Sequence, residues 1–418
     1  MALASRILGT RQMVTPPAPD AVRPVPCSRM TVSERADVVV VGLGAMGSAV
    51  CAQLASRGTS VIGIDQYDPP HPYGSTHGET RMTRVAVGEG PEYVPLVRRS
   101  HELWREIEAQ TGTRLLTQPG GLILSRPGGW FFEGTRSLAR RFGIEHEELS
   151  PAELRNRFPM FAVDEETEGY YEPQAGFVRP EDAVRAQLEL ARRGGAELRP
   201  GERVVDWSAS GEGVGVVTDR ATYAAEQLIL CAGPWLPGLF PEGRDLLAVH
   251  RQLQFWFPIR QGYERLRNMP VFVWDFGGEP GGFVHVDGFY GFPAVDGPGG
   301  GVKVATETYV TTTQPDGRQH PATPEETAAM YRHCIEDRLP WLGPEPVRTL
   351  SCLYTSTRGS RFVIDRHPDH EAVLIVSPCS GHGFKHSAAI GEAVAQWVTD
   401  GTPELDLGPF GLPDAGPD

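Results

Sequence analysis

The sequence predicts an α/β plus α+β architecture, in which a discontinuous parallel-sheet domain is interrupted by an inserted, mostly antiparallel-sheet domain. The 418 residues are too many for one ordinary hydrophobic core. A strand–turn–helix–strand unit spans Asp37–Asp65, and the same style returns in the buried run Ala372–Val376 and the helix Ser387–Thr399. Between them lie alternating, aromatic-rich strands, predicted at Gln252–Phe257, Val271–Trp274, Phe283–Val286, Phe289–Phe292 and Val302–Thr306.

The first strand–turn–helix unit carries a candidate binding site. Val38–Val41 are four consecutive valines, a run typical of a parallel strand that is buried on both faces. In the G-x-G-x-x-G turn that follows, Gly42 permits a tight bend, Gly44 lets a pyrophosphate approach the backbone, and Gly47 lets the helix pack closely. Asp65 ends the second strand, where it can accept a hydrogen bond from a ribose hydroxyl. This context predicts a Rossmann-type dinucleotide site and leaves FAD and NAD open.

Composition argues against several classes of partner. The formal net charge is −14, whereas nucleic acids and anionic membranes bind clustered Lys and Arg. No apolar run approaches the ~20 residues that a membrane-spanning helix needs. The six cysteines form no C-x-x-C pair, and their scatter is typical of a reduced, cytoplasmic chain. Residues 1–34 are rich in proline without apolar periodicity and are expected to be a disordered extension, with Met30 as an alternative start.

The C-terminal stretch Ser380–Lys385 is a second candidate site. Gly381 and Gly383 expose backbone just before a helix, which favours a bound negative charge. A carboxylate or a flavin oxygen is the expected partner of Lys385, and ordinary surface solvation is the alternative. Another buried strand ends at Ala232-Gly233, which suggests close approach of the backbone to a ligand.

Two other chemistries have weaker support at this stretch. His382 and His386 lie four residues apart, but the Glu of H-E-x-x-H and a third ligand are missing, so no metal site is predicted. Ser380 lacks the flanking residues of a hydrolase G-x-S-x-G turn.

From about Asp37 to past Gly401 the chain resembles the monomeric sarcosine oxidase and N-methyltryptophan oxidase family, FAD-dependent amine oxidases of the D-amino-acid-oxidase-like class. The matched stretches occur in the same order along the chain. They are Gly42–Gly47, Gly74–Arg84, Tyr290–Pro293, Lys303, Cys352–Thr355, Ile364–Pro368 and Ser380–Lys385.

The resemblance implies FAD as the cofactor, attached covalently through a thioether to Cys352. It also implies that Lys303 lies near flavin N5 and promotes the reaction with oxygen, because a fixed cation stabilises developing superoxide. From the sequence alone, an edge-strand lysine facing water is the alternative. The residues expected to bind the cofactor are Gly42, Gly44, Ala45, Met46, Gly47, Asp65, Arg81, Gly233, Cys352, Gly381, His382, Gly383, Phe384 and Lys385.

For the substrate, the resemblance implies a carboxylate held by Arg84 and Lys385, with Tyr290 close by. His77 and Arg81 resemble residues that contact the flavin and favour negative charge on its reduced ring. One position departs from the family: sarcosine-type members have a histidine four residues after the lysine, and this chain has Glu307. Sarcosine itself is therefore in doubt, and a larger or more basic amine is the alternative.

These observations predict an FAD-dependent oxidase of secondary amines or N-methyl amino acids that reduces O2 to H2O2. A cyclic imino acid oxidase or dehydrogenase and a non-catalytic FAD-binding module are the alternatives. The chain is expected to be a cytoplasmic monomer that binds a small-molecule amine and O2. The FAD-binding domain is predicted at 35–115, 175–240 and 360–418, and the substrate domain at 116–174 and 241–359.

Overall fold

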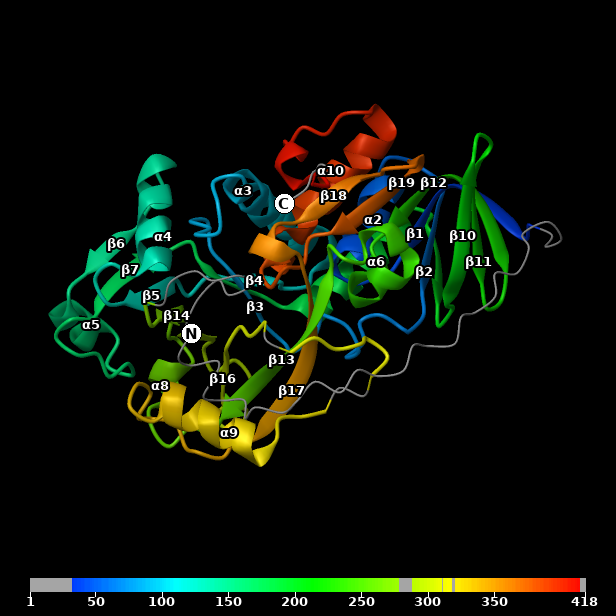
Figure 1. Ribbon diagram of the computed structural model, residues 1–418. Coiled ribbons are helices and arrows are strands. Elements are labelled where there is room, and N and C mark those ends of the chain that lie inside the picture. The colour runs from blue at the N-terminus through cyan, green and yellow to red at the C-terminus, as the bar shows by residue number, and fades with distance from the viewer. Residues whose placement is uncertain (1–31, 278–287, 310, 318–319, 414–418) are drawn as a thin grey trace.

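The computed structural model describes residues 32–277, 288–309, 311–317 and 320–413 (Figure 1). The predicted extension at 1–34 lies outside this part except for its last three residues, and the strand predicted at Phe283–Val286 and the cysteine Cys27 lie wholly outside it. Two eight-stranded sheets and one three-stranded sheet organise the chain.

The first sheet is assembled from distant segments of the chain. Its parallel strands, in spatial order, are β9 (Glu197–Pro200), β2 (Val61–Asp65), β1 (Glu34–Val41), β12 (Thr222–Leu230) and β19 (His370–Ser377). Antiparallel partners extend it: β11 (Gly213–Thr218), β10 (Val204–Ser210) and β18 (Val363–His367). This confirms the predicted discontinuous Rossmann-type sheet.

The four valines of β1 hold two layers together. Val38 and Val40 pack into the cluster formed with the helical layer, whereas Val39 and Val41 pack into a second cluster on the other face. The helical layer comprises α2 (Ala45–Ser56), α3 (Tyr93–Thr111), α6 (Pro180–Arg193) and α10 (Ser387–Asp400), with α2 against α6 and α10. The predicted burial of this strand on both faces is confirmed.

The second sheet is antiparallel except where β14 and β5 pair in parallel. Its order is β17 (Arg348–Ser356), β13 (Ala248–Phe257), β16 (Val302–Ala305), β15 (Gly288–Gly291), β14 (Val271–Asp275), β5 (Gly121–Ser125), β7 (Glu168–Glu172) and β6 (Glu147–Leu149). Figure 1 shows β5–β7 at one end of the molecule and β10–β11 at the other. These strands fall within 116–174 and 241–359, although the exact domain boundaries stay a prediction.

Smaller elements complete the structure. The third sheet joins β3 (Arg81–Thr83), β8 (Gly176–Val178) and β4 (Leu116–Thr117). The remaining α-helices of the described part are α4 (Trp130–Arg141), α5 (Pro151–Arg157), α7 (Leu236–Leu239), α8 (Tyr263–Leu266) and α9 (Pro324–Met330). In the part of the chain that the structure describes, no helix has the length and apolar character to cross a bilayer.

The helix α9 changes type along its length. It begins where Thr323 and Glu326 form a capping box. Its α-helical part ends at Met330, and a π-helical turn continues it over Tyr331–Ile335. Local sequence signals mark the start of a helix more sharply than its end.

Replacing Gly47 with alanine tests the contact between α2 and the glycine turn. A Cβ on Gly47 would lie 1.7 Å from the carbonyl oxygen of Gly42, so backbone must move. We expect Gly47→Ala to lower the free energy of unfolding by about 1–3 kcal/mol or more, measured by chemical denaturation. Gly211→Ala is the matched control, since a Cβ there meets nothing within 4 Å. An unchanged stability in Gly47→Ala would contradict the close packing.

Candidate active site

A cavity of about 500 Å³ opens where the two large sheets meet. Val41, Asp65 and Ser377 line it from the carboxyl ends of β1, β2 and β19, and Tyr290 lines it from β15. The carboxyl ends of parallel strands are where ligands bind in open α/β sheets. The cavity therefore lies between the carboxyl ends of the parallel strands of the first sheet and the second sheet.

Most of the predicted site residues lie on this cavity. Those that line it are Gly42, Gly44, Ala45, Met46, Asp65, Arg81, Arg84, Gly233, Tyr290, Glu307, Gly381, His382, Gly383, Phe384 and Lys385. Four do not line it: Gly47, His77, Lys303 and Cys352.

Asp65 braces the glycine turn. Its Oδ2 accepts a hydrogen bond of 2.8 Å from the backbone N–H of Leu43, and its Oδ1 accepts one of 2.9 Å from that of Tyr67. Gly42 has φ +91°, which suits glycine, and the helix α2 begins directly behind the turn. A carboxylate has about four lone-pair sites, so Asp65 keeps acceptor capacity toward the cavity.

The backbone of residues 78–80 is held from two sides by opposite charges. Glu181, in the first turn of α6, accepts hydrogen bonds from the N–H groups of Gly78 at 2.6 Å and Glu79 at 3.1 Å. Lys303 of β16 donates to the carbonyl oxygens of Gly78 at 2.7 Å and Thr80 at 2.9 Å. We call this arrangement the 78–80 clamp.

Lys303 is an interior residue. Its side chain is 3% exposed and β16 lies between β13 and β15, so the water-facing alternative is wrong. Burial and the nearby Arg81 lower the pKa of Lys303 well below its usual value. Its Nζ nevertheless lies within hydrogen-bond distance of three oxygens, the third being Thr80 Oγ1 at 3.3 Å, and an ammonium group can donate to all three.

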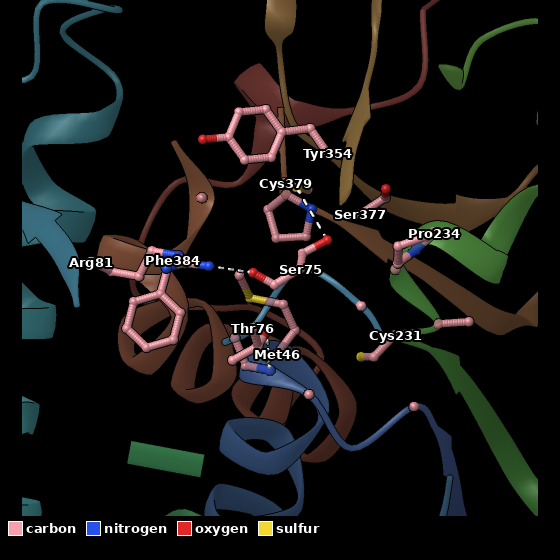
Figure 2. A pocket seen from close by; sticks show the side chains of 18 of the residues that line it. Met46, Ser75, Thr76, Arg81, Cys231, Pro234, Tyr354, Ser377, Cys379 and Phe384 are labelled. Atoms are coloured by element: carbon pink, nitrogen blue, oxygen red, sulfur yellow. Dashed lines mark hydrogen bonds between the residues drawn. The ribbon is translucent and has the colours of Figure 1, made fainter. Parts of the chain in front are cut away.

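The clamp positions the residues on either side of it. Arg81 donates from Nη2 to the Ser75 carbonyl at 2.7 Å and from Nη1 to the Thr80 carbonyl at 2.9 Å (Figure 2). His77 is buried, and neither ring nitrogen has a hydrogen-bond partner within the described residues. Burial and the Arg81 charge lower the pKa of His77 to about 3, so its imidazole is neutral.

At the other end of the cavity, Arg84 and Lys385 share a carboxylate that the sequence did not single out. Arg84 Nη2 lies 2.6 Å from Glu89 Oε2, and Lys385 Nζ lies 3.7 Å from Glu89 Oε1. Lys385 also donates to the His382 carbonyl at 2.8 Å and is buried, so surface solvation is wrong for it. Burial lowers the pKa of Lys385 to about 8, although Glu89 acts in the opposite direction.

Tyrosines surround the neighbouring Glu307. The hydroxyls of Tyr290 and Tyr354 lie 3.4 Å apart, and Tyr309 donates to Glu307 Oε2 at 3.3 Å. Burial, mainly, raises the pKa of Tyr290 and Tyr354. This wall of the cavity combines aromatic surface with hydroxyl groups.

Cys352 lies on β17, buried, and receives a hydrogen bond of 3.2 Å from Gln254 Nε2 to its Sγ. Burial raises its pKa, while Arg81 and Lys303 act to lower it. Two other thiols, those of Cys231 and Cys379, do line the cavity, and Figure 2 shows Cys379 beside Ser75 and Tyr354.

The paired histidines of the C-terminal stretch belong to an aromatic cluster. His382 stacks on Phe362, and its Nε2 lies 3.1 Å from the Ser360 carbonyl oxygen. Tyr93 contacts both His382 and His386. No group of three His, Cys, Asp or Glu side chains suited to a metal ion occurs within residues 32–277, 288–309, 311–317 and 320–413.

Known proteins match this chain over nearly its whole length. The family described as FAD dependent oxidoreductase matches residues 37–397. The chain belongs to this family. A monomeric sarcosine oxidase from Streptomyces avermitilis is 38% identical over 380 residues, which cover 90% of this chain and 96% of that protein. An N-methyl-L-tryptophan oxidase from Yersinia pestis is 32% identical over 382 residues, covering 90% and 98%.

A solved structure shares the fold. It is that of NikD, described as an unusual amino acid oxidase essential for nikkomycin biosynthesis, with a TM-score of 0.79 and 25% identity, covering 92% of this chain and 99% of NikD. The predicted family, the fold class and a flavin-dependent oxidoreductase are thereby confirmed. The alternative of a non-catalytic FAD-binding module has no support among these relatives.

The residues present in this FAD-dependent oxidoreductase fit FAD. One cavity is lined by the glycine turn and Asp65 and also by Tyr290, so an extended dinucleotide can contact all of these residues. Buried polar atoms without a partner in the described residues stand beside it, including His77 Nδ1 and Nε2 and Gln254 Oε1. Such orphaned atoms are uncommon in a protein interior unless a ligand or water satisfies them.

Two residues of the site, Glu89 and Glu181, were not identified from the sequence, and Tyr354 was identified only as part of the matched stretch Cys352–Thr355. Glu89 stands in the stretch directly after the matched Gly74–Arg84, and this position was the only available signal. Glu181 follows Pro180 at the start of α6, where an acidic residue is common in any helix and therefore does not indicate a functional role. Arg84 is only five residues from Glu89, but Lys385 is far from Glu89 in the sequence, and Gly78 and Glu79 are far from Glu181. No local pattern identifies these distant pairs.

The 78–80 clamp gives a stability prediction. Both N–H groups donate to Glu181 Oε1, so Glu181→Gln keeps an acceptor oxygen but removes its negative charge, which weakens both hydrogen bonds. We expect a loss of about 1–3 kcal/mol in the free energy of unfolding near pH 7. Glu189→Gln is the control on the same helix, since Glu189 pairs with Arg193 at the surface and such pairs contribute about 0–1 kcal/mol.

The effect of Glu181→Gln on the free energy of unfolding should also depend on pH. Burial raises the pKa of Glu181, but hydrogen bonds from Glu79 and Gly78 and the Arg81 charge outweigh it, so the pKa is lowered overall. A lowered folded-state pKa stabilises above the unfolded value of about 4.3, and the stabilisation disappears as pH falls through the folded value. The difference between parent and Glu181→Gln should therefore shrink below about pH 4. A constant difference from pH 7 to acid would contradict the charged clamp.

Proposed function

We propose that this FAD-dependent oxidoreductase oxidises the C–N bond of a secondary amine, in an N-methyl amino acid of the sarcosine or N-methyltryptophan type, to an imine and reduces O2 to H2O2. The observation that carries the proposal is the single cavity that holds both the glycine turn with Asp65 and the cations Arg84 and Lys385. The curated relatives are named for oxidation of sarcosine and N-methyl-L-tryptophan.

The substrate carboxylate binds Arg84 and Lys385 in this proposal. Arg84 offers a planar fork and Lys385 a point charge, and together they orient an amino acid. Both cations contact Glu89 in the structure, so the substrate carboxylate must share them with that side chain. Tyr290 and Tyr354 provide hydroxyls and aromatic surface beside the bound molecule.

We propose that the glycine turn and Asp65 hold the ADP half of FAD. The flavin ring is proposed to bind beside Arg81 and the Gly381–Lys385 segment. FAD, when bound, supplies the two-electron acceptor for the C–N bond. Arg81 presents a fixed positive charge to that part of the cavity, and the neutral His77 offers a donor or acceptor from behind it. Lys303 keeps an ammonium group in the same region, where it is proposed to favour reduction of O2.

Covalent attachment of FAD through Cys352 is a further part of the proposal. Cys352 is buried next to Arg81 and Lys303, whose charges act to lower the pKa of its thiol against the effect of burial. A thiolate is the nucleophilic form of cysteine, so this environment supports the assignment. Cys379 is the alternative nucleophile, because it lines the cavity.

A cyclic imino acid substrate remains the second candidate. An L-proline dehydrogenase from P. horikoshii shares the fold with a TM-score of 0.74 at 21% identity, which supports the fold alone. Its presence nonetheless makes proline and pipecolate useful members of a substrate panel. The monomeric state and the cytoplasmic location stay predictions.

Anaerobic reduction of the flavin tests the function directly. We expect at least one of sarcosine, N-methyl-L-tryptophan, L-proline and pipecolate to bleach the flavin absorbance of the purified holoenzyme. Air should restore the colour with one H2O2 formed per amine oxidised. Buffer and acetate, which has the carboxylate without the amine, are the controls. Absence of bleaching with every amine would contradict the proposed oxidase, and restoration without peroxide would indicate a dehydrogenase.

Acid precipitation tests the covalent bond. We expect the precipitated parent protein to stay yellow, because a thioether survives denaturation, and Cys352→Ala to release its flavin into the supernatant. Cys379→Ala is the matched control and should retain the colour. Loss of colour from the parent would disprove covalent attachment. Release from Cys379→Ala instead of Cys352→Ala would move the bond to the cavity-lining thiol.

A further inference from the structure

Glu307 is an acidic side chain in the proposed amine site. It lines the same cavity as Arg84 and Lys385 and stands four residues after Lys303. Its Oε2 accepts a hydrogen bond of 3.3 Å from the Tyr309 hydroxyl. It forms no ion pair within 4.0 Å with any residue that the structure describes.

The charged and titratable groups that face Glu307 come from several elements. Glu89, Lys385 and Arg84 act on it by charge, and Tyr309 acts on it by a hydrogen bond. The charge of Glu307 acts in turn on Lys385, Tyr290, Tyr354 and Tyr309. Glu307 therefore interacts with both the carboxylate-binding cations and the tyrosine wall of the same cavity. A substrate held by its carboxylate has its nitrogen in this same region.

A count of charges shows what Glu307 lacks. Arg84 and Lys385 carry two positive charges, and Glu89 with a bound substrate carboxylate carries two negative charges. The carboxylate of Glu307 adds a third negative charge, which accepts a hydrogen bond from Tyr309 but has no cation within 4.0 Å among the described residues. A buried, unpaired carboxylate is unfavourable, and one further cation removes the imbalance. The ammonium group of an amino acid is a cation of that kind.

We infer that Glu307 is a catalytic residue that binds the ammonium group of the amino acid substrate and accepts its proton, so that the amine is neutral when it is oxidised. The inference rests on the proposed function, because it assumes that the carboxylate of the substrate binds Arg84 and Lys385. It names the substrate as an amino acid taken up in its zwitterionic form.

The proton transfer is balanced without an oxidant. One N–H bond of the ammonium breaks, its electron pair stays on nitrogen as a lone pair, and the proton forms an O–H bond with the carboxylate of Glu307. Burial, together with Glu89, raises the pKa of Glu307 to about 7, with Lys385 and Arg84 acting in the opposite direction. Burial and the same two cations lower the pKa of a bound ammonium, which brings donor and acceptor closer.

Ligand binding tests the charge match without catalysis. Trimethylglycine and 3,3-dimethylbutanoate have the same shape and the same carboxylate, but only trimethylglycine carries a positive charge. We expect the parent holoenzyme to bind trimethylglycine at least tenfold more tightly, measured by perturbation of the flavin absorbance at pH 8. In Glu307→Gln the affinities for the two ligands should differ by less than about threefold, because a neutral amide removes most of the attraction to the cation.

Two further variants complete the binding experiment. Asp316→Asn removes one charge from the same cavity near the Asp65 end, where Asp316 accepts a hydrogen bond from Trp235, and should leave the preference unchanged. Glu307→Asp keeps the carboxylate and should retain a preference above that of Glu307→Gln. If Glu307→Gln fails to hold FAD, Glu307→His takes its place. An unchanged preference in the variant without the carboxylate overturns the inference.

The pH dependence of flavin reduction tests the proton transfer. With the best amine of the panel, the ionisation that limits the reduction rate of the parent should lie near pH 7. In Glu307→Gln it should move upward by more than one pH unit toward the free amine, whose pKa is about 10 as in other alkyl ammonium groups. An unmoved ionisation overturns the proton transfer. If no amine reduces the flavin, the proposed function fails, yet the binding preference still decides the charge match.

Discussion

The active site depends on the 78–80 clamp, in which two opposite charges hold one short stretch of backbone. Glu181 from the first turn of α6 takes the N–H groups, and Lys303 from β16 takes the carbonyl oxygens. Since α6 packs on the first sheet and β16 belongs to the second, the clamp joins the two halves of the molecule at the cavity. The cavity wall formed by Arg81 follows directly from it.

The cavity itself is organised by charge balance. At one end Arg84, Lys385 and Glu89 form a buried group of two cations and one carboxylate, which leaves attraction for one anion. The carboxylate of Glu307 brings the net charge of this group to zero, so a bound ligand carboxylate leaves attraction for one cation. An amino acid zwitterion carries both charges at a fixed separation, so electrostatics and shape favour the same class of ligand. Low dielectric strengthens each of these interactions.

Sequence patterns predicted the architecture well and the site in part. Val38–Val41 and Gly42–Gly47 predicted the first strand, turn and helix because burial and backbone conformation there are local properties. The sequence did not decide whether Lys303 points inward, because the sequence of a four-residue strand does not show which strands lie beside it. Glu89 and Glu181 escaped notice, because their partners are set by folding. The roles of all these residues in catalysis stay predictions.

By itself, the sequence determined the two kinds of sheet, the glycine turn and the family to which the chain belongs, since short-range periodicity and ordered motifs carry that information. The tertiary structure alone decided that Glu181 and Lys303, which are 122 positions apart in the sequence, both hydrogen-bond to the backbone of residues 78–80. It also decided that Glu307 and Glu89 lie on one cavity with Arg84 and Lys385. The physical reason is that charge interactions depend on distance in space, whereas a sequence records only distance along the chain.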